Sequence, residues 1–147
     1  MSGKANIWQR RKARRALVQA VYQWQLAGSP ARALVAEFAA SDALKKADSE
    51  FFEAILQGVI GDVQQLDELL TPHLDRSIGA LDQIERAILR LAVFELRGRI
   101  DVPYRVVIDE YVELAKTFGA QDGHKYVNGV IDKLAAQLRK LEVEAGE

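Results

Sequence analysis

The sequence predicts an all-α fold, a compact bundle of about seven helices without β-strands. Apolar residues recur every three or four positions along most of the chain, the spacing that puts them on one face of an α-helix. No segment alternates apolar and polar residues with a period of two, as a half-buried strand would. Alanine-rich and charged stretches favour helix, and only three prolines interrupt the 147 residues.

The first helix is expected from about Gln9 to Ala27, because Gly28 follows and favours a helix end. One arc of this helix is apolar and comprises Ala13, Ala16, Leu17, Ala20, Val21 and Trp24. Ser29-Pro30 is typical of an N-cap followed by proline at the first helical position, so a second helix is expected over 30–40.

A long third helix is expected over 48–70, with Asp48 as its N-cap and Thr71-Pro72 as its end. Its predicted buried stripe comprises Phe52, Ile55, Val59, Val63, Leu66 and Leu70. Residues 73–80 are expected to form a turn or a short helix.

The fourth major helix, expected over 82–98, is apolar on two sides. One stripe comprises Ile84, Ala87, Ile88, Leu91 and Phe94, and the second comprises Leu89, Val93 and Leu96. Such a helix is either central in a bundle or covered by a partner. Burial in the bundle is the simpler interpretation, and a protein partner at Leu89 and Val93 is the alternative.

Two further helices complete the predicted fold. One begins at Asp101-Val102-Pro103 and ends before Gly119, and the last begins near Asp122, which can cap it. The tail 142–147 is expected to be frayed.

Charge is distributed unevenly along the chain. The first 36 residues hold seven basic side chains and no acid, and residues 37–147 hold 13 basic and 21 acidic ones. In the basic arm, residues 1–15, four side chains are expected to project away from the apolar arc with Arg10 at its edge; the four are Arg11, Lys12, Arg14 and Arg15. Tyr22 falls at nearly the same angle as Arg15, about 10 Å along the axis.

Arginines that grip phosphates beside a ring that stacks a base suit single-stranded RNA. The alternative interpretation is a solvated charged face with an ordinary surface tyrosine. For Trp8, packing against the start of the first helix is favoured over stacking on a base.

Catalytic, metal and membrane functions find little support. Cysteine is absent, and the two histidines, His73 and His124, lie far apart. No nucleophile elbow or glycine-rich phosphate loop occurs. The sequence therefore predicts a non-enzymatic protein without cofactor or metal. No run of 18 apolar residues or secretory leader is present, so a cytoplasmic location is expected.

Two motifs resemble the NusB family of transcription antitermination factors. The first is Arg10-Arg-Lys-Ala-Arg14 followed by Gln19-Ala-Val-Tyr-Gln-Trp-Gln25. The second combines Asp101-Val-Pro-Tyr104, Glu110, Glu113-Leu-Ala-Lys116, Phe118-Gly119 and His124-Lys-Tyr-Val-Asn-Gly129, and is the more specific. Together they span nearly the whole chain. The resemblance implies a single helical RNA-binding domain, residues 1–147, built of two subdomains.

The resemblance also implies partners and roles. The partners would be boxA-type RNA, the ribosomal protein NusE and the RNA polymerase antitermination complex on ribosomal RNA operons. The RNA surface would comprise Arg10, Arg11, Lys12, Arg14, Tyr22, Asp122, Lys125 and Tyr126, with Arg15 added by its place on the basic face. Glu85 and its neighbours would contact NusE. Gly123 stands where some members carry serine, so a hydroxyl contact is expected to be absent.

Two other functions fit the same helices. One is an RNA-binding module of the kind that precedes a ribosomal RNA methyltransferase, although no methyltransferase segment or cysteine nucleophile is present. The other is a homodimeric interaction protein whose basic arm aids solubility. A salt-dependent interaction with RNA distinguishes the second from an RNA-binding protein.

Overall fold

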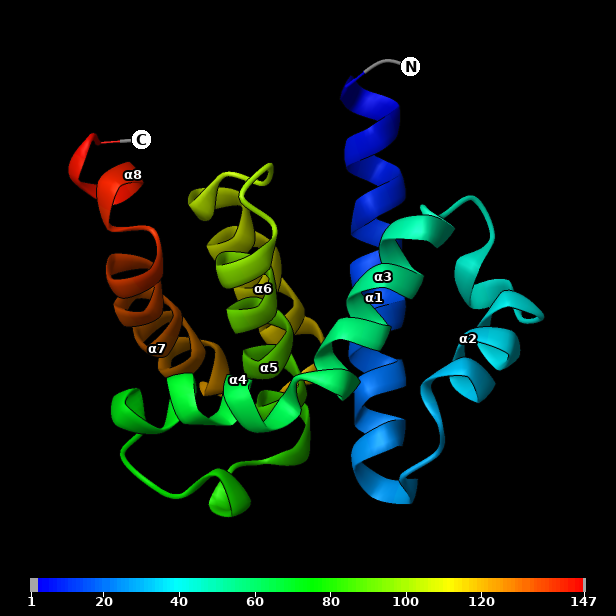
Figure 1. The fold of residues 1–147 in the computed structure, drawn as a ribbon, viewed down its shortest axis with the longest axis horizontal. Helices are drawn as coiled ribbons and strands as arrows, with labels where there is room; N and C mark the ends of the chain where they lie inside the picture. The colour runs from blue at the N-terminus through cyan, green and yellow to red at the C-terminus, as the bar shows by residue number, and fades with distance from the viewer. Residues whose placement is uncertain (1–2, 147) are drawn as a thin grey trace. The chain divides into compact units, whose positions relative to one another are not determined.

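The computed structural model describes residues 3–146, and their regular secondary structure consists of helices without a strand (Figure 1). The prediction of an all-α fold is thereby confirmed. The chain divides into two compact units, Met1–Gly61 and Asp62–Glu147. Each unit buries its own apolar stripes. Residues 1, 2 and 147, which belong to the predicted basic arm and tail, lie outside the described residues.

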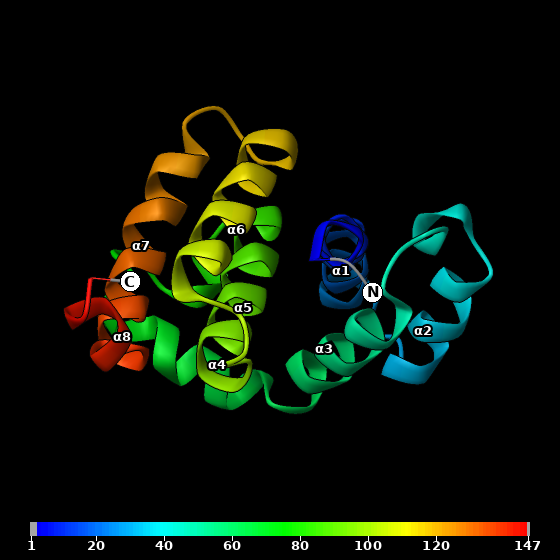
Figure 2. The ribbon, with the colours of Figure 1, turned by 90° about the horizontal axis from the view of Figure 1, so that it is seen from above.

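In its described residues, from position 3 on, the first unit has three α-helices and one 3-10 helix. These are α1 (Gly3–Ala27), α2 (Ala31–Ala39), η1 (Asp42–Leu44) and α3 (Ser49–Gly61). Helix α1 packs against α3 and α2 (Figure 2). The predicted apolar arc of α1 is buried as far as Val21, while Trp24 is half-buried. Phe38 of α2 meets Phe52 of α3, with ring centroids 5.6 Å apart.

Helix α1 begins at Gly3, six residues before the predicted start. Trp8 therefore lies inside the helix, with 57% of its surface exposed, and the interpretation of Trp8 as a packed residue ahead of the helix is wrong.

The predicted helix over 48–70 is in fact two helices. Helix α3 ends at Gly61, and α4 (Val63–Leu70) begins after Asp62, whose φ of −108° and ψ of 15° leave the helical region. Val59, Val63, Leu66 and Leu70 continue one helical spacing across the break, so periodicity alone does not reveal it. Two features favour a break here. Gly61 ends α3, and glycine is the poorest helix former after proline. Arg97 donates a hydrogen bond of 2.7 Å to the carboxylate of Asp62, the residue that leaves the helical region.

The second unit is built around α5 (Gln83–Gly98), which packs against α4, α6 and α7. The other elements are η2 (Thr71–His73), η3 (Ile78–Ala80), α6 (Tyr104–Phe118), α7 (Gly123–Leu138) and α8 (Lys140–Glu144). Ten of the 16 residues of α5 are buried. Its two apolar sides are thus explained by a central position.

Leu89 and Val93 are fully buried by the chain's own atoms. They cannot form a surface for another protein, so their assignment as partner contacts is corrected. Glu95, on the same helix, is fully buried and accepts a hydrogen bond of 2.5 Å from the Tyr111 hydroxyl.

The end of the chain is more ordered than predicted, because residues 140–144 form α8. Glu142 accepts hydrogen bonds from the Tyr104 backbone N–H at 2.8 Å and from Arg139 at 2.7 Å. These bonds lower the pKa of the Glu142 carboxyl. Arg139 is itself buried, and its guanidinium donates hydrogen bonds to two backbone carbonyls. One belongs to Leu96 in the last turn of α5, and the other belongs to Arg99, the residue after α5. The expectation of fraying is therefore wrong for residues 142–144.

Candidate nucleic-acid interface

The basic arm of α1 divides into an inner and an outer set. Arg14 is 3% exposed, and its guanidinium lies 4.9 Å from the centre of the Phe51 ring. Arg10 lies over the same ring at 4.6 Å and reaches Asp48 at 3.6 Å. Both side chains cover the core of the first unit. The prediction that Arg14 projects outward is therefore wrong, and the Arg10 side chain is partly buried.

The outer set comprises Arg11, Lys12 and Arg15, which are exposed. The Arg11 guanidinium lies 4.8 Å from the centre of the exposed Trp8 ring, a cation–π pair open to solvent. Tyr22 is half-buried on the same continuous helix, at nearly the angle of Arg15. The outer set thus offers positive charge and aromatic rings along one helix.

A shallow hollow of about 250 Å³ adds a lysine to this face. It is lined by Lys12, Arg15 and Gln19 of α1 and by Asp42, Ala43 and Lys45 around η1. Lys45 was not predicted from the sequence, because it lies in a loop without helical periodicity. The basic pair Lys45-Lys46 was the one sequence feature that could have pointed to it. The loop of the first unit therefore brings another cation to the exposed side of α1.

The second unit holds the predicted residues at the start of α7. Asp122 precedes the helix with a left-handed φ of 66°, and its side chain makes no capping hydrogen bond, contrary to expectation. The carboxylate lies 3.4 Å from the Lys125 ammonium instead. This pair is exposed, so its net stabilisation is small.

Tyr126 lies among polar groups of the loop before η3. Its hydroxyl accepts a hydrogen bond of 3.3 Å from the Asp75 backbone N–H. The Arg76 guanidinium lies 4.7 Å from the centre of the ring and is itself held by the Asp75 carboxylate at 2.6 Å. Burial raises the pKa of the Tyr126 hydroxyl. Arg76 could not be identified from the sequence, since 50 residues separate it from Tyr126.

Glu85 of α5 lies against the start of α7. Its carboxylate occupies the place where a side chain at Gly123 would begin, so serine or alanine at position 123 would displace it. Glu85 is 7% exposed. Burial and the nearby Asp82 raise the pKa of its carboxyl, and Arg76 opposes the rise. The second unit therefore brings Glu85 close to the 122–126 segment.

We expect Glu85→Gln to stabilise the protein at neutral pH. Because the pKa of Glu85 is raised in the folded state, the contribution of this group to stability falls as pH increases from the ordinary glutamate range through the raised value. The melting temperature of the variant should exceed that of the wild type at pH 7, and the two should converge below pH 4. The exposed Glu113→Gln is the control, and an equal gain there would contradict a penalty specific to Glu85.

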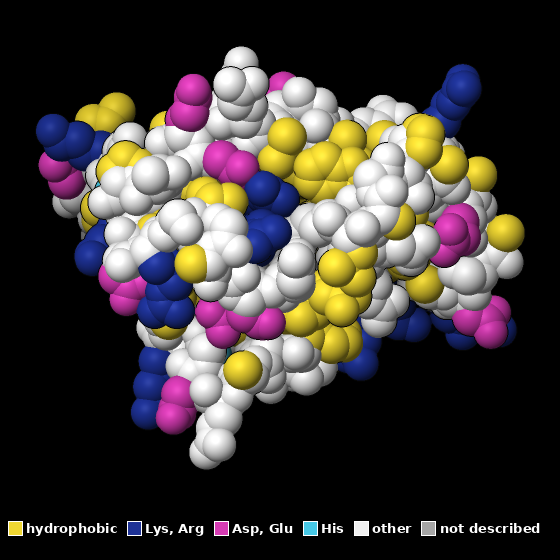
Figure 3. All heavy atoms as spheres, turned by 90° about the horizontal axis from the view of Figure 1, so that it is seen from below, with side chains coloured by type: hydrophobic (Ala, Val, Ile, Leu, Met, Phe, Trp, Pro, Cys, Tyr) yellow, Lys and Arg dark blue, Asp and Glu magenta, His cyan; other side chains and the backbone are white. Residues whose placement is uncertain are grey.

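The structure places the predicted residues in two groups, one in each unit. Arg11, Lys12, Arg15 and Tyr22 lie in the first unit, and Asp122, Lys125, Tyr126 and Glu85 lie in the second. That both groups border one RNA-binding groove stays a prediction. On the face shown in Figure 3, basic and acidic side chains are interspersed, so that face has no broad area of one sign.

Within residues 3–146, no three acidic or histidine side chains are grouped as a metal site would require. No helix in the described part of the chain is long and apolar enough to cross a membrane.

Comparison with known proteins identifies close relatives. The NusB family model matches residues 11–136. The transcription antitermination protein NusB of Alcanivorax borkumensis is 59% identical over 133 residues, which cover 90% of this chain and 89% of the relative. The Hahella chejuensis protein of the same name is 51% identical, over 94% and 93%. The solved structure of T. maritima NusB superposes with a TM-score of 0.80 at 29% identity, covering 91% of this chain and 96% of that one.

Proposed function

Because the chain belongs to the NusB family of transcription antitermination proteins, we propose that it binds boxA-type single-stranded RNA together with the ribosomal protein NusE. It would do so as part of the antitermination complex on RNA polymerase. The family is non-enzymatic, and the relatives are antitermination factors, which disfavours a module of an RNA methyltransferase.

The observation that carries the proposal is the exposed face of α1. Arg11, Lys12 and Arg15 are exposed there, with Tyr22 beside them and no acid in the helix. Cations can follow a phosphate backbone, and a ring can stack an unpaired base. Lys45 supports the same face from the loop around η1.

The second unit supports a contribution from α7. Lys125 is exposed, and the Tyr126 ring is fixed through its hydroxyl and beneath Arg76. We propose that this ring takes part in stacking and that Arg76, which the sequence did not single out, extends the contact. Arginine planes stack on bases as aromatic rings do.

Glu85 is the candidate contact for NusE. A nearly buried carboxylate whose pKa is raised is costly to keep ionised, and such groups are more frequent at functional sites. A basic side chain of the partner would stabilise the ionised form. Glu85→Gln should accordingly weaken association with NusE in a pull-down or titration while RNA binding by the protein alone stays unchanged.

The direct test is RNA binding as a function of salt. We expect the double variant Arg11→Ala, Arg15→Ala to weaken binding of every single-stranded RNA tested. The slope of log K against log salt is negative, and the loss of two phosphate contacts should reduce its magnitude by about 1.4. This corresponds to about 25-fold weaker binding at 0.1 M salt. Fluorescence anisotropy with labelled RNA measures both quantities.

The matched control removes two exposed lysines of the second unit, with Lys116→Ala and Lys140→Ala in one variant. Circular dichroism must show that both double variants fold. If the α1 variant and the control bind RNA equally well, the basic face serves solubility and the proposed RNA surface is wrong.

A further inference from the structure

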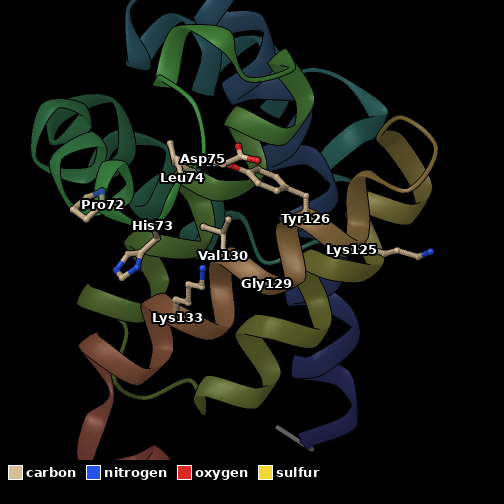
Figure 4. Close-up of a pocket in the computed structure, with 9 residues that line it drawn as sticks. All are labelled: Pro72, His73, Leu74, Asp75, Lys125, Tyr126, Gly129, Val130 and Lys133. Carbon is tan, nitrogen blue, oxygen red and sulfur yellow. Dashed lines mark hydrogen bonds between the residues drawn. The ribbon is translucent and has the colours of Figure 1, made fainter.

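A groove lies beside Tyr126, entirely within the second unit (Figure 4). One wall is the loop of Pro72 to Asp75, and the other is formed by Tyr126, Gly129, Val130 and Lys133 of α7. We call it the α7 groove. Its volume is about 360 Å³, near the lower end of the range for small-ligand sites. A single nucleotide matches this size better than a longer segment.

Both ends of the loop wall are tied to α7. His73 Nε2 and Gln137 Oε1 are 2.7 Å apart at one end, and the Asp75 backbone N–H donates to the Tyr126 hydroxyl at the other. A wall held in this way loses little conformational freedom when a ligand enters. The groove is therefore already formed in the protein without RNA.

The floor of the groove is open at Gly129. Gly129 has no side chain, and nothing lies within 4 Å of where its Cβ would be. Val130 is 3% exposed, and Leu74 lines the opposite wall. A planar base can lie over Gly129 between these side chains, whereas a larger residue at position 129 would fill the same space.

The far end of the groove carries positive charge. Lys133 is exposed, and Figure 4 shows its ammonium turned toward Val130 and His73, while Lys125 extends away from the groove. The one acid in the lining, Asp75, is held by Arg76 through bonds of 2.6 and 3.0 Å. The unit as a whole is acidic, with 11 basic and 16 acidic side chains in residues 62–147, so this end differs in sign from its surroundings.

We propose that the α7 groove binds one nucleotide of the RNA next to the nucleotide at Tyr126. Its base lies over Gly129, and its phosphate contacts Lys133. This inference rests on the proposed RNA-binding function and adds a site to it. Lys133 lies seven residues after Tyr126, about 10 Å along the helix, so the RNA would follow α7.

The charge of the site is tested with Lys133→Gln and fluorescence anisotropy on a labelled single-stranded boxA-type RNA. Loss of one phosphate contact should reduce the magnitude of the negative salt slope by about 0.7 and weaken binding about fivefold at 0.1 M salt. Lys116→Gln, an exposed lysine of α6 in the same unit, is the matched control and should change neither quantity.

The space of the site is tested with Gly129→Leu. Leucine favours helix more than glycine does, so the melting temperature should not fall. RNA binding should nevertheless weaken about tenfold, within the range for a lost base contact. Gly129→Ala adds only a Cβ and should have a smaller effect.

The outcomes distinguish a failure of the α7 groove proposal from a failure of the proposed RNA-binding function. If the wild type binds RNA and neither Lys133→Gln nor Gly129→Leu differs from its control, the α7 groove is empty in the complex and only this inference fails. If the wild type does not bind RNA at any salt concentration, the proposed function fails, and the groove proposal fails with it.

Discussion

Val93→Asp should prevent stable folding of the protein. Val93 is fully buried in the central helix α5, and the aspartate would place a carboxylate among apolar side chains. Burying an unpaired charge, or raising its pKa until it is neutral, costs about 5 kcal/mol or more, as much as the whole stability of many domains. Circular dichroism at 222 nm and a thermal melt measure the loss.

Val106→Asp is the matched control, since Val106 is 40% exposed on α6. That variant should fold and melt close to the wild type. If Val93→Asp also folds and melts normally but no longer associates with NusE, Val93 belongs to a partner surface, and the structural assignment to the core is wrong.

Tyr22→Ala should weaken RNA binding by about 1–3 kcal/mol, or roughly 5- to 150-fold, the range for a lost base stack. The salt slope should hardly change, because no phosphate contact is removed. Tyr22→Phe should bind like the wild type if the ring rather than the hydroxyl is used. Since Tyr22 is half-buried, affinity must be measured by anisotropy on protein shown to be folded.

Asp122→Asn, unlike Tyr22→Ala, should not weaken RNA binding. The Asp122 carboxylate repels phosphate and lies 3.4 Å from Lys125, so its neutralisation leaves that ammonium free for RNA. Affinity should stay equal or increase. If Tyr22→Ala binds like the wild type while Asp122→Asn binds more weakly, the RNA lies on another face of the protein.

The sequence alone predicted the features that depend on local spacing. The stripes of α5, its start after Asp82 and the end of α6 before Gly119 follow from helical periodicity and end preferences, which involve residues within a few turns of one another. The exposed positions Arg11, Lys12 and Arg15 follow from the same geometry. The family resemblance, which comparison confirmed, came from motifs that are also local.

Tertiary structure decided where long side chains and two-sided helices lie. The angle around a helix fixes where a Cβ points but not where a guanidinium ends, because an arginine can lay its stem along an apolar surface. The guanidinium groups of Arg10 and Arg14 thus lie over the ring of Phe51 of α3. The break at Asp62, the burial of Leu89 and Val93 and the position of Arg76 over Tyr126 likewise depend on contacts between distant parts of the sequence. Local periodicity contains no information about such contacts, and only the packed chain determines them.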